Sequence, residues 1–176
     1  MGMERKVYIG IDPGKRGFIS VMSGGGIEFF SLSDHSDIEV SEFIGRYCGH
    51  CCHAVIEDVH AVYGSSAGAT FEFGRVKGFL LGLLVAHRIP YTLVQPKEWQ
   101  GVIWTSADMV VGRKSVVSGV GSAVTRRVTD TKATSFNAAL RIFPSVDFRK
   151  SGRCRKVDDN KVDALLMAEY ARRRNL

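Results

Sequence analysis

The sequence lacks the features that mark membrane and secreted proteins. It contains no apolar run that approaches the roughly 18 residues needed for a membrane-spanning helix. Its first residues lead directly into a short apolar stretch without a cleavage site, so we expect no secretory signal. Cysteine is scarce as well: 4 residues at uneven spacing are not the framework of a disulfide-rich domain. We therefore expect a reducing compartment, namely the cytoplasm, the nucleoid or an organelle matrix, and no membrane.

What is present is the composition of a folded protein. Hydrophobic residues make up 45% of the chain and charged residues 24%, which excludes disorder, collagen and coiled coil for the chain as a whole. A length of 176 residues predicts one domain over residues 1–176. The 24 Lys and Arg outnumber the 18 Asp and Glu, giving a formal net charge of +6. This balance favours an anionic partner without deciding between nucleic acid and a membrane surface.

The order of apolar and turn residues predicts an α/β fold. Runs at residues 7–11, 17–22 and 27–32, joined by glycine turns, indicate an antiparallel three-stranded meander. Helices and short strands alternate after it, so we expect helices that cover a sheet. The expected helices span residues 38–48, 71–87, 96–104, 132–142 and about 158–174, and the expected further strands span 54–57 and 91–94. Residues 106–130 fit either a mobile insertion or a strand pair around Gly119-Val120-Gly121.

Acidic residues follow two of the expected strands and begin the last helix. Asp12 ends the first strand and Glu57 the fourth, and Asp159 and Asp163 are four residues apart on one helix face. Carboxylates gathered at strand ends repel one another unless a cation such as Mg²⁺ or Mn²⁺ neutralises them. Two such ions about 4 Å apart can activate a water and stabilise the leaving oxygen of a phosphodiester. Each acid also has a structural interpretation, Asp12 as a turn former and Asp158 or Asp159 as a helix cap.

Four segments of the chain form a more specific pattern. They are Ile9-Gly10-Ile11-Asp12-Pro13-Gly14, Ile56-Glu57-Asp58-Val59-His60, Thr70-Phe71-Glu72-Phe73-Gly74-Arg75 and Asp158-Asp159-Asn160-Lys161-Val162-Asp163-Ala164-Leu165-Leu166. In this order they resemble the RuvC family of Holliday junction resolvases, in the branch with phage and plastid enzymes. The resemblance covers most of the chain outside residues 106–130. It implies an RNase H-like mixed sheet, with an antiparallel meander plus parallel strands, flanked by helices.

The resemblance also implies a function. It implies a homodimer that nicks four-way DNA junctions symmetrically, with two Mg²⁺ ions in each active site and Mn²⁺ as a substitute. Asp12, Glu57 and Asp163 match the metal-binding acids of the family. The family places the fourth ligand three or four residues before the last acid, which favours Asp159 by helix geometry, with Asp158 as the fallback.

Lys132 lies in the segment where the family has an active-site lysine. Its ammonium would offset charge that develops on the scissile phosphate, although a solvated lysine at a helix start is common. The family also uses an aromatic side chain near the second acid to wedge between bases. Here that position is His60, and Tyr63 is the alternative, with Phe73 also near.

Basic residues that flank the proposed site are candidate phosphate contacts, although a run of charges is more often a solvated surface. They are Arg75, Lys77, Arg113, Lys114, Arg126, Arg127, Arg149, Lys150, Arg153, Arg155 and Lys156. Four of these residues, Arg113, Lys114, Arg126 and Arg127, lie in the segment 106–130. We expect this segment to be either a loop that clamps the junction or a disordered spacer.

Two further patterns each leave two interpretations open. Gly74, Gly78 and Gly82 recur every four residues on the 71–87 helix, and this smooth stripe either packs on the sheet or forms the seam of a dimer. The resemblance favours the dimer seam. The cluster Cys48-Gly49-His50-Cys51-Cys52-His53 either binds zinc or holds reduced thiols, and the shortage of a distant second ligand pair favours thiols.

Three other functions compete with a junction resolvase. A phosphotransferase with a phosphate loop at Asp12-Pro13-Gly14-Lys15 is disfavoured by chain length, because that superfamily clamps its nucleotide between two domains. A junction-binding protein without catalysis and an RNase H-like nuclease that acts on hybrids or transposon ends are the other two.

Overall fold

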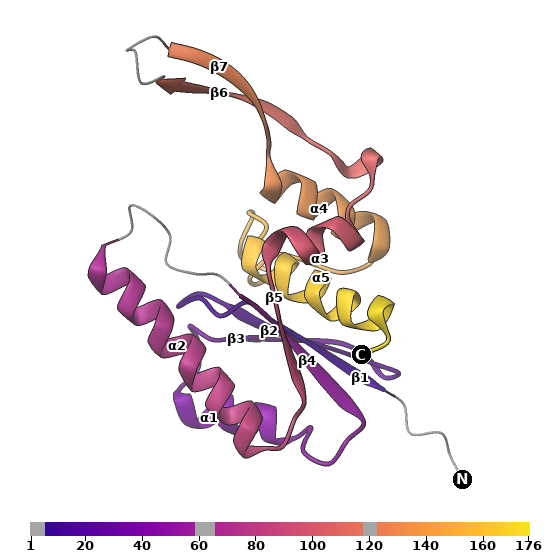
Figure 1. Ribbon diagram of the computed structural model, residues 1–176. Coiled ribbons are helices and arrows are strands. Elements are labelled where there is room, and N and C mark those ends of the chain that lie inside the picture. The colour runs from indigo at the N-terminus through magenta and orange to yellow at the C-terminus, as the bar shows by residue number, and fades with distance from the viewer. Residues whose placement is uncertain (1–5, 59–65, 118–122) are drawn as a thin grey trace.

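A five-stranded sheet lies at the centre of the computed structural model, which describes residues 6–58, 66–117 and 123–176 (Figure 1). The strand order is β3-β2-β1-β4-β5. The first three strands pair antiparallel, and β4 and β5 run parallel to β1. The strands are β1 (Val7–Ile11), β2 (Phe18–Ser23), β3 (Gly26–Ser31), β4 (Cys52–Glu57) and β5 (Tyr91–Val94). The predicted mixed sheet with an antiparallel meander is therefore confirmed.

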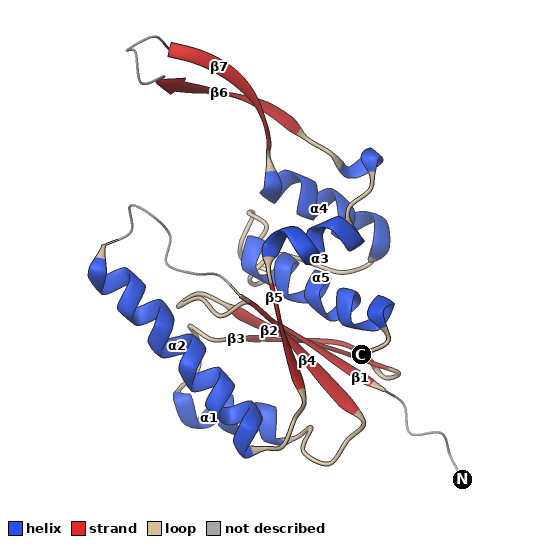
Figure 2. Ribbon diagram, in the orientation of Figure 1, coloured by secondary structure: helices blue, strands red, loops and turns tan. Residues whose placement is uncertain are grey.

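Helices cover both faces of this sheet, which gives three layers (Figure 2). One face packs against α1 and α2, and the other against α5, which in turn contacts α3 and α4. The helices are α1 (Asp37–Gly45), α2 (Ala67–Ala86), α3 (Pro96–Ile103), α4 (Thr131–Ile142) and α5 (Asp159–Arg174), with a short 3₁₀ turn at Ser106–Asp108. Among the described residues, none of these helices has both the length and the hydrophobicity to cross a membrane.

The alternation of side chains along β1 determines how closely α5 approaches the sheet. Ile9 and Ile11 are buried in the core on the α1 and α2 side, so Gly10 between them faces α5. A Cβ atom at Gly10 would collide with the backbone of Ala164 and lie 2.5 Å from the backbone nitrogen of Ala168. Glycine at this position therefore lets α5 lie against the carboxyl-terminal half of β1.

The predicted element boundaries differ from the structure at two helices. The second helix begins at Ala67 instead of residue 71, because Ser66 caps it and its Oγ accepts a hydrogen bond from the Ala69 amide at 3.2 Å. The first helix ends at Gly45 instead of residue 48, since the following residues form a turn.

Of the two interpretations of residues 106–130, the strand pair is confirmed: β6 (Val111–Val117) and β7 (Ala123–Thr129) pair antiparallel. The expected turn at Gly119-Val120-Gly121 lies outside the described residues.

Candidate active site

Two carboxylates follow adjacent parallel strands at the same edge of the sheet. Ile11 of β1 pairs with Ile56 of β4. Asp12 directly follows Ile11, and Glu57 directly follows Ile56. Trp99 of α3, which is fully buried, donates a hydrogen bond from Nε1 to Oε1 of Glu57 at 2.9 Å. The sheet register thus brings Asp12 and Glu57 to one place, and Trp99 fixes the orientation of the second carboxylate.

A third carboxylate comes from α5. Asp163 immediately precedes Ala164, which lies against Gly10, so the close approach of α5 to β1 brings this side chain to the strand ends. Its Oδ1 atom is buried and has no hydrogen-bond partner among the described residues. Burial, opposed by the neighbouring Ser135 hydroxyl, raises the pKa of Asp163 to about 7, and the charge of Glu57 contributes to this rise.

The three carboxylates interact electrostatically. Burial raises the pKa of Asp12 well above its usual value, and the charges of Asp163, Glu57 and Asp158 raise it further. Burial also raises the pKa of Glu57, although Trp99 and Lys77 oppose this shift. The ionised forms are therefore destabilised where they lie, and a proton or a cation is needed to relieve the repulsion.

Two more acids stand at the start of α5 and have different partners. Asp158 is the N-cap residue, and its Oδ1 accepts hydrogen bonds from the amides of Asn160 at 3.1 Å and Lys161 at 3.4 Å. Asp159 pairs through Oδ2 with Nζ of Lys132 at 2.7 Å. The helix-cap interpretation thus describes Asp158, whereas the carboxylate of Asp159 contacts the predicted active-site lysine.

These residues suit a hard divalent cation by their chemistry. All the donors are carboxylate oxygens, which Mg²⁺ and Mn²⁺ prefer, and one of them is buried without a partner. In residues 6–58, 66–117 and 123–176, however, no three His, Cys, Asp or Glu side chains are arranged so that they could hold one metal ion. The carboxylates are therefore electrostatic neighbours and not a closed coordination shell.

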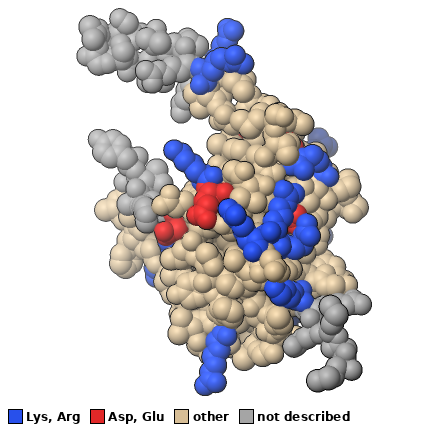
Figure 3. Space-filling view, turned by 45° about the vertical axis from the view of Figure 1, so that its right-hand side comes forward, with Lys and Arg blue, Asp and Glu red and all other residues tan. Residues whose placement is uncertain are grey.

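A basic depression adjoins the acids at the start of α5. It is a cavity of about 380 Å³, bordered by Asp158 and Asp159 on the acidic side. Its basic lining residues are Arg16, Lys132, Lys150 and Lys156. Figure 3 shows Asp and Glu side chains in the middle of one face with Lys and Arg side chains around them. This arrangement of charges suits a phosphate group next to the carboxylates.

The other predicted basic contacts differ in their surroundings. Arg149 is held by the carboxylate of Asp147 at 2.7 Å, and Lys150 lies 2.7 Å from Asp34. Arg153, Arg155 and Lys156 are exposed in the same loop.

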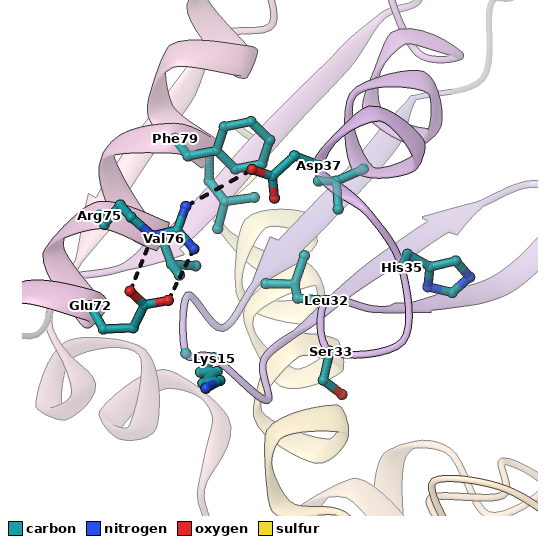
Figure 4. Close-up of a pocket in the computed structure, with 12 residues that line it drawn as sticks. Lys15, Leu32, Ser33, His35, Asp37, Glu72, Arg75, Val76 and Phe79 are labelled. Atoms are coloured by element: carbon teal, nitrogen blue, oxygen red, sulfur yellow. Dashed lines mark hydrogen bonds and ion pairs between the residues drawn. The ribbon is translucent and has the colours of Figure 1, made fainter. Parts of the chain in front are cut away.

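Two predicted basic contacts on α2 already have acidic partners. The ammonium of Lys77 pairs with Asp58, and both side chains are largely buried. Arg75 contacts Glu72 at 3.0 Å and Asp37 at 3.9 Å. The ion pairs of Arg75, but not that of Lys77, border a cavity of about 230 Å³ between α1, α2 and the turn after Asp12 (Figure 4).

Of the predicted aromatic contacts, Phe73 is half-buried near the start of α2, and both His60 and Tyr63 lie outside the described residues.

The glycine stripe of α2 faces outward. Gly74, Gly78 and Gly82 are exposed, and a Cβ atom at any of them would have no neighbour within 4 Å in the described part of the chain. The interpretation that this stripe packs on the sheet is therefore wrong, because the opposite face of α2 contains the buried Leu80 and Leu84. The stripe continues into Phe71, which is 74% exposed, and Val85, which is 64% exposed.

The cysteine cluster does not form a metal centre in the described structure. Cys48 and Cys51 are exposed, whereas Cys52 is buried and donates to the carbonyl of Tyr47 at 3.4 Å. His53 contacts Thr92 Oγ1 at 2.8 Å.

Sequence reasoning missed two residues of the site. The sequence pattern predicts only that Trp99 lies in a helix. A buried indole usually needs a hydrogen-bond acceptor, and this is the signal that points to a carboxylate partner. Arg16 belongs to the turn after Asp12, where its carbonyl accepts a hydrogen bond from Asn160 at 3.1 Å. No sequence signal identifies Arg16, because the cavity joins it to residues more than 100 positions away.

Comparisons with known proteins identify the fold. No model of a protein family matches the sequence, and no curated protein matches it. RuvC of Thermus thermophilus in complex with a Holliday junction substrate matches the structure with 12% identity and a TM-score of 0.53, over 96% of each chain. Another structure of RuvC from Thermus thermophilus matches with 14% identity and a TM-score of 0.49, over 96% of each chain. The chain therefore has the RNase H-like fold of RuvC.

Proposed function

We propose that this protein is a metal-dependent nuclease that resolves four-way DNA junctions by paired, symmetric phosphodiester hydrolysis. The observation that supports this proposal most strongly is the meeting of Asp12, Glu57 and Asp163. Burial raises the pKa of all three, and the charges of neighbouring carboxylates raise the pKa of Asp12 and Asp163 further. A fold that brings three interacting, partly buried carboxylates to one edge of its sheet loses stability as a result. A function that requires a cation at that edge explains why these residues are acids.

The metal ligands in this proposal are Asp12, Glu57, Asp159 and Asp163. Two Mg²⁺ ions, or Mn²⁺ in their place, would supply an activated water and stabilise the charge on the leaving oxygen. Asp163 suits this role because its buried Oδ1 has no other described partner. Asp159 suits it better than Asp158, since Oδ1 of Asp158 already accepts hydrogen bonds from the first turn of α5.

The remaining residues of the site orient the acids and bind phosphate. Trp99 holds the carboxylate of Glu57 through its indole N–H. Lys132 lies beside Asp159 and is 70% exposed, so its ammonium is accessible to a phosphate that enters the basic depression. There it would stabilise the negative charge that develops on the scissile phosphate. Arg16, Lys150 and Lys156 would bind neighbouring phosphates of the same strand.

Branched DNA is the substrate that the fold and the charges favour. The protein of similar fold was solved in complex with a Holliday junction substrate. The formal net charge of +6 and the basic loop over residues 149–156 provide phosphate contacts beyond the active site. Such contacts give affinity for DNA without reading its sequence.

A homodimer would let two active sites act on one two-fold junction. We assign the dimer seam to the outward stripe of α2, because Gly74, Gly78 and Gly82 leave its backbone open between two exposed apolar side chains. Gly78→Arg is expected to convert the dimer to a monomer in light scattering after size exclusion. The matched control is Gly101→Arg, an exposed helical glycine of α3 with equally open space. A monomeric wild-type protein would overturn this assignment.

A substrate comparison tests the proposed function. Labelled four-way junction, matched duplex and RNA–DNA hybrid are each incubated with the protein and Mg²⁺, Mn²⁺ or EDTA. Metal-dependent nicks at symmetric positions of the junction alone support the proposal. Preferential cleavage of the hybrid would favour another RNase H-like nuclease, and junction binding without nicks would favour a non-catalytic binding protein.

A further inference from the structure

The two strands β6 and β7 form a ribbon that extends away from the body of the protein (Figures 1 and 2). They form a two-stranded sheet of their own, with seven residue pairs from Val111↔Thr129 to Val117↔Ala123. An isolated two-stranded ribbon is only marginally stable in water. Interactions with the body of the protein therefore have to hold the base of the ribbon.

The base of the ribbon is connected to α4 through an ion pair between the buried Asp108 and the partly exposed Arg141. Asp108, which is 2% exposed, accepts hydrogen bonds from Arg141 Nε at 2.8 Å and Nη2 at 2.7 Å. The amide and hydroxyl of Thr105 donate to the same carboxylate at 2.7 and 2.9 Å. These bonds hold the pKa of Asp108 down to about 2, so the ion pair stays charged at neutral pH.

Two more contacts connect the ribbon to the same helix. Asn137 of α4 donates to the carbonyl of Asp108 at 3.1 Å, and Thr134 Oγ1 accepts from the amide of Val110 at 3.1 Å. The other strand continues directly into α4, since β7 ends at Thr129 and Lys132 is in the first turn of the helix. The base of the ribbon is thus fixed next to the proposed active-site lysine.

The ribbon is basic where it leaves the body. Its strand register pairs Arg113 with Arg127 and Lys114 with Arg126, which are the third and fourth pairs from the base. Arg113 and Arg127 are exposed, and neither strand contains an acidic residue. Like charges directly opposite each other destabilise a strand pair. A polyanionic partner would neutralise these charges, so the arrangement suits such a partner.

We propose that the β6–β7 ribbon is a DNA-binding element that contacts the phosphate backbone of the duplex next to the cleaved phosphate. This inference rests on the proposed function, because it takes the partner to be the DNA bound at Lys132. Arg113 lies three residues beyond Val110, whose amide is bonded to Thr134 of α4, so it is roughly 10 Å from this anchor at about 3.4 Å per residue, which is the length of about three base pairs. The ribbon would therefore contact phosphates about three nucleotides from the nick.

The first test is the salt dependence of junction binding. Affinity for an immobile four-way junction is measured in EDTA between about 50 and 200 mM salt for the wild type and for Arg113→Ala/Arg127→Ala. Each lost phosphate contact lowers the slope of log K against log salt by about 0.9, so the double variant is expected to lower it by about 1–2. Arg113→Lys/Arg127→Lys keeps the charges and is expected to keep the slope.

The control removes two positive charges at the other end of the molecule. Lys6 precedes the start of β1, whereas Asp12 follows its end. Arg174 ends α5, whereas the acids of the proposed site lie in the first turns of that helix. Lys6→Ala/Arg174→Ala is expected to leave the slope unchanged. Thermal unfolding of each variant checks that the fold is intact.

A second measurement locates the contact. Single methylphosphonates replace charged phosphates along one strand of the junction, and binding is measured for each substitution. Some substitutions about three nucleotides from the nick are expected to weaken binding of the wild type and have no effect on Arg113→Ala/Arg127→Ala. Equal salt slopes and equal methylphosphonate profiles for the wild type and Arg113→Ala/Arg127→Ala would overturn the ribbon proposal. If the wild type still nicks the junction, the proposed function stands. A wild type that binds no DNA would overturn both.

Discussion

Nζ of Lys132 lies 2.7 Å from Oδ2 of Asp159, and this ion pair joins the first turn of α4 to the first turn of α5. A cation in the first turn of a helix is unfavourable for the helix dipole, so Lys132 is not placed there for the stability of α4. Lys132 instead contacts a proposed metal ligand, Asp159, and lines the basic depression.

Substitution of Lys132 is therefore expected to affect catalysis more than folding. Lys132→Ala should lower the rate of junction nicking by about 10²–10³-fold, because one charge-stabilising donor is lost from the transition state. Junction affinity and melting temperature should change little. Single-turnover nicking under saturating protein measures the rate, and Lys6→Ala is the control. A variant that nicks as fast as the wild type would exclude Lys132 from the reaction.

Asp158 and Asp159 should separate into a structural and a functional role. Asp158→Ala removes the N-cap of α5 and is expected to lower the free energy of unfolding by about 1 kcal/mol, while Asp158→Asn keeps a capping oxygen and should be nearly neutral. Asp159→Asn should instead abolish most Mg²⁺-dependent nicking with little change in stability. Denaturant unfolding and nicking assays on the three variants test this division. Loss of nicking in Asp158→Asn, with activity kept in Asp159→Asn, would reverse the assignment.

Asp163 should destabilise the metal-free protein at neutral and higher pH. Its pKa in the folded state is about 7, above the unfolded value of 3.8, so the folded state holds the proton more tightly. Stability should therefore fall as pH rises from about 4 to about 7 and stay low above that range.

Asp163→Asn removes this penalty. In EDTA at about pH 8 the variant is expected to be more stable than the wild type by an amount of the order of 2 kcal/mol. Mg²⁺ should raise the melting temperature of the wild type but not that of the variant, because the variant lacks the proposed ligand. Thermal unfolding with and without Mg²⁺ checks both effects. A variant that is less stable than the wild type in EDTA would show that the carboxylate stabilises the fold without a cation.

Asp108 should show the opposite pH dependence. Its folded pKa of about 2 lies below the unfolded value of 3.8, so its stabilising effect is complete above about pH 4 and is lost as pH falls towards 2. Asp108→Asn is expected to lower the free energy of unfolding by about 2 kcal/mol at pH 7, and this difference should shrink between about pH 4 and pH 2. Urea unfolding over this pH range provides the measurement. A difference that does not depend on pH would exclude the ion pair with Arg141 as its source.

Much of the fold could be predicted from local patterns. The three strands of the meander follow from β-branched runs and glycine turns, and the strand at Tyr91–Val94 was located to the residue. The start of α2 could not be located in this way, because Ala67 to Thr70 are small residues that resemble a loop until Ser66 is recognised as the cap. The strand pair β6 and β7 is one of two interpretations, because the sequences of Val111–Val117 and Ala123–Thr129 show no regular alternation of apolar and polar residues.

The site could likewise be predicted only where a local pattern marks its residues. Asp12 and Glu57 stand at strand ends, and a position at a strand end can be read from sequence. The burial of Asp163 depends on how closely α5 approaches Gly10, and the contact of Trp99 with Glu57 depends on where α3 packs. Such tertiary contacts leave no periodic signal in the chain.

The most direct test of the central claim is the cleavage of a labelled immobile four-way junction by the wild type and by Asp12→Asn, each in Mg²⁺ and in EDTA. The account predicts paired nicks at symmetric positions for the wild type in Mg²⁺, with no nicks in EDTA and none from the variant. Nicks of equal rate from Asp12→Asn, or a wild type that binds the junction and leaves it intact in both Mg²⁺ and Mn²⁺, would contradict it.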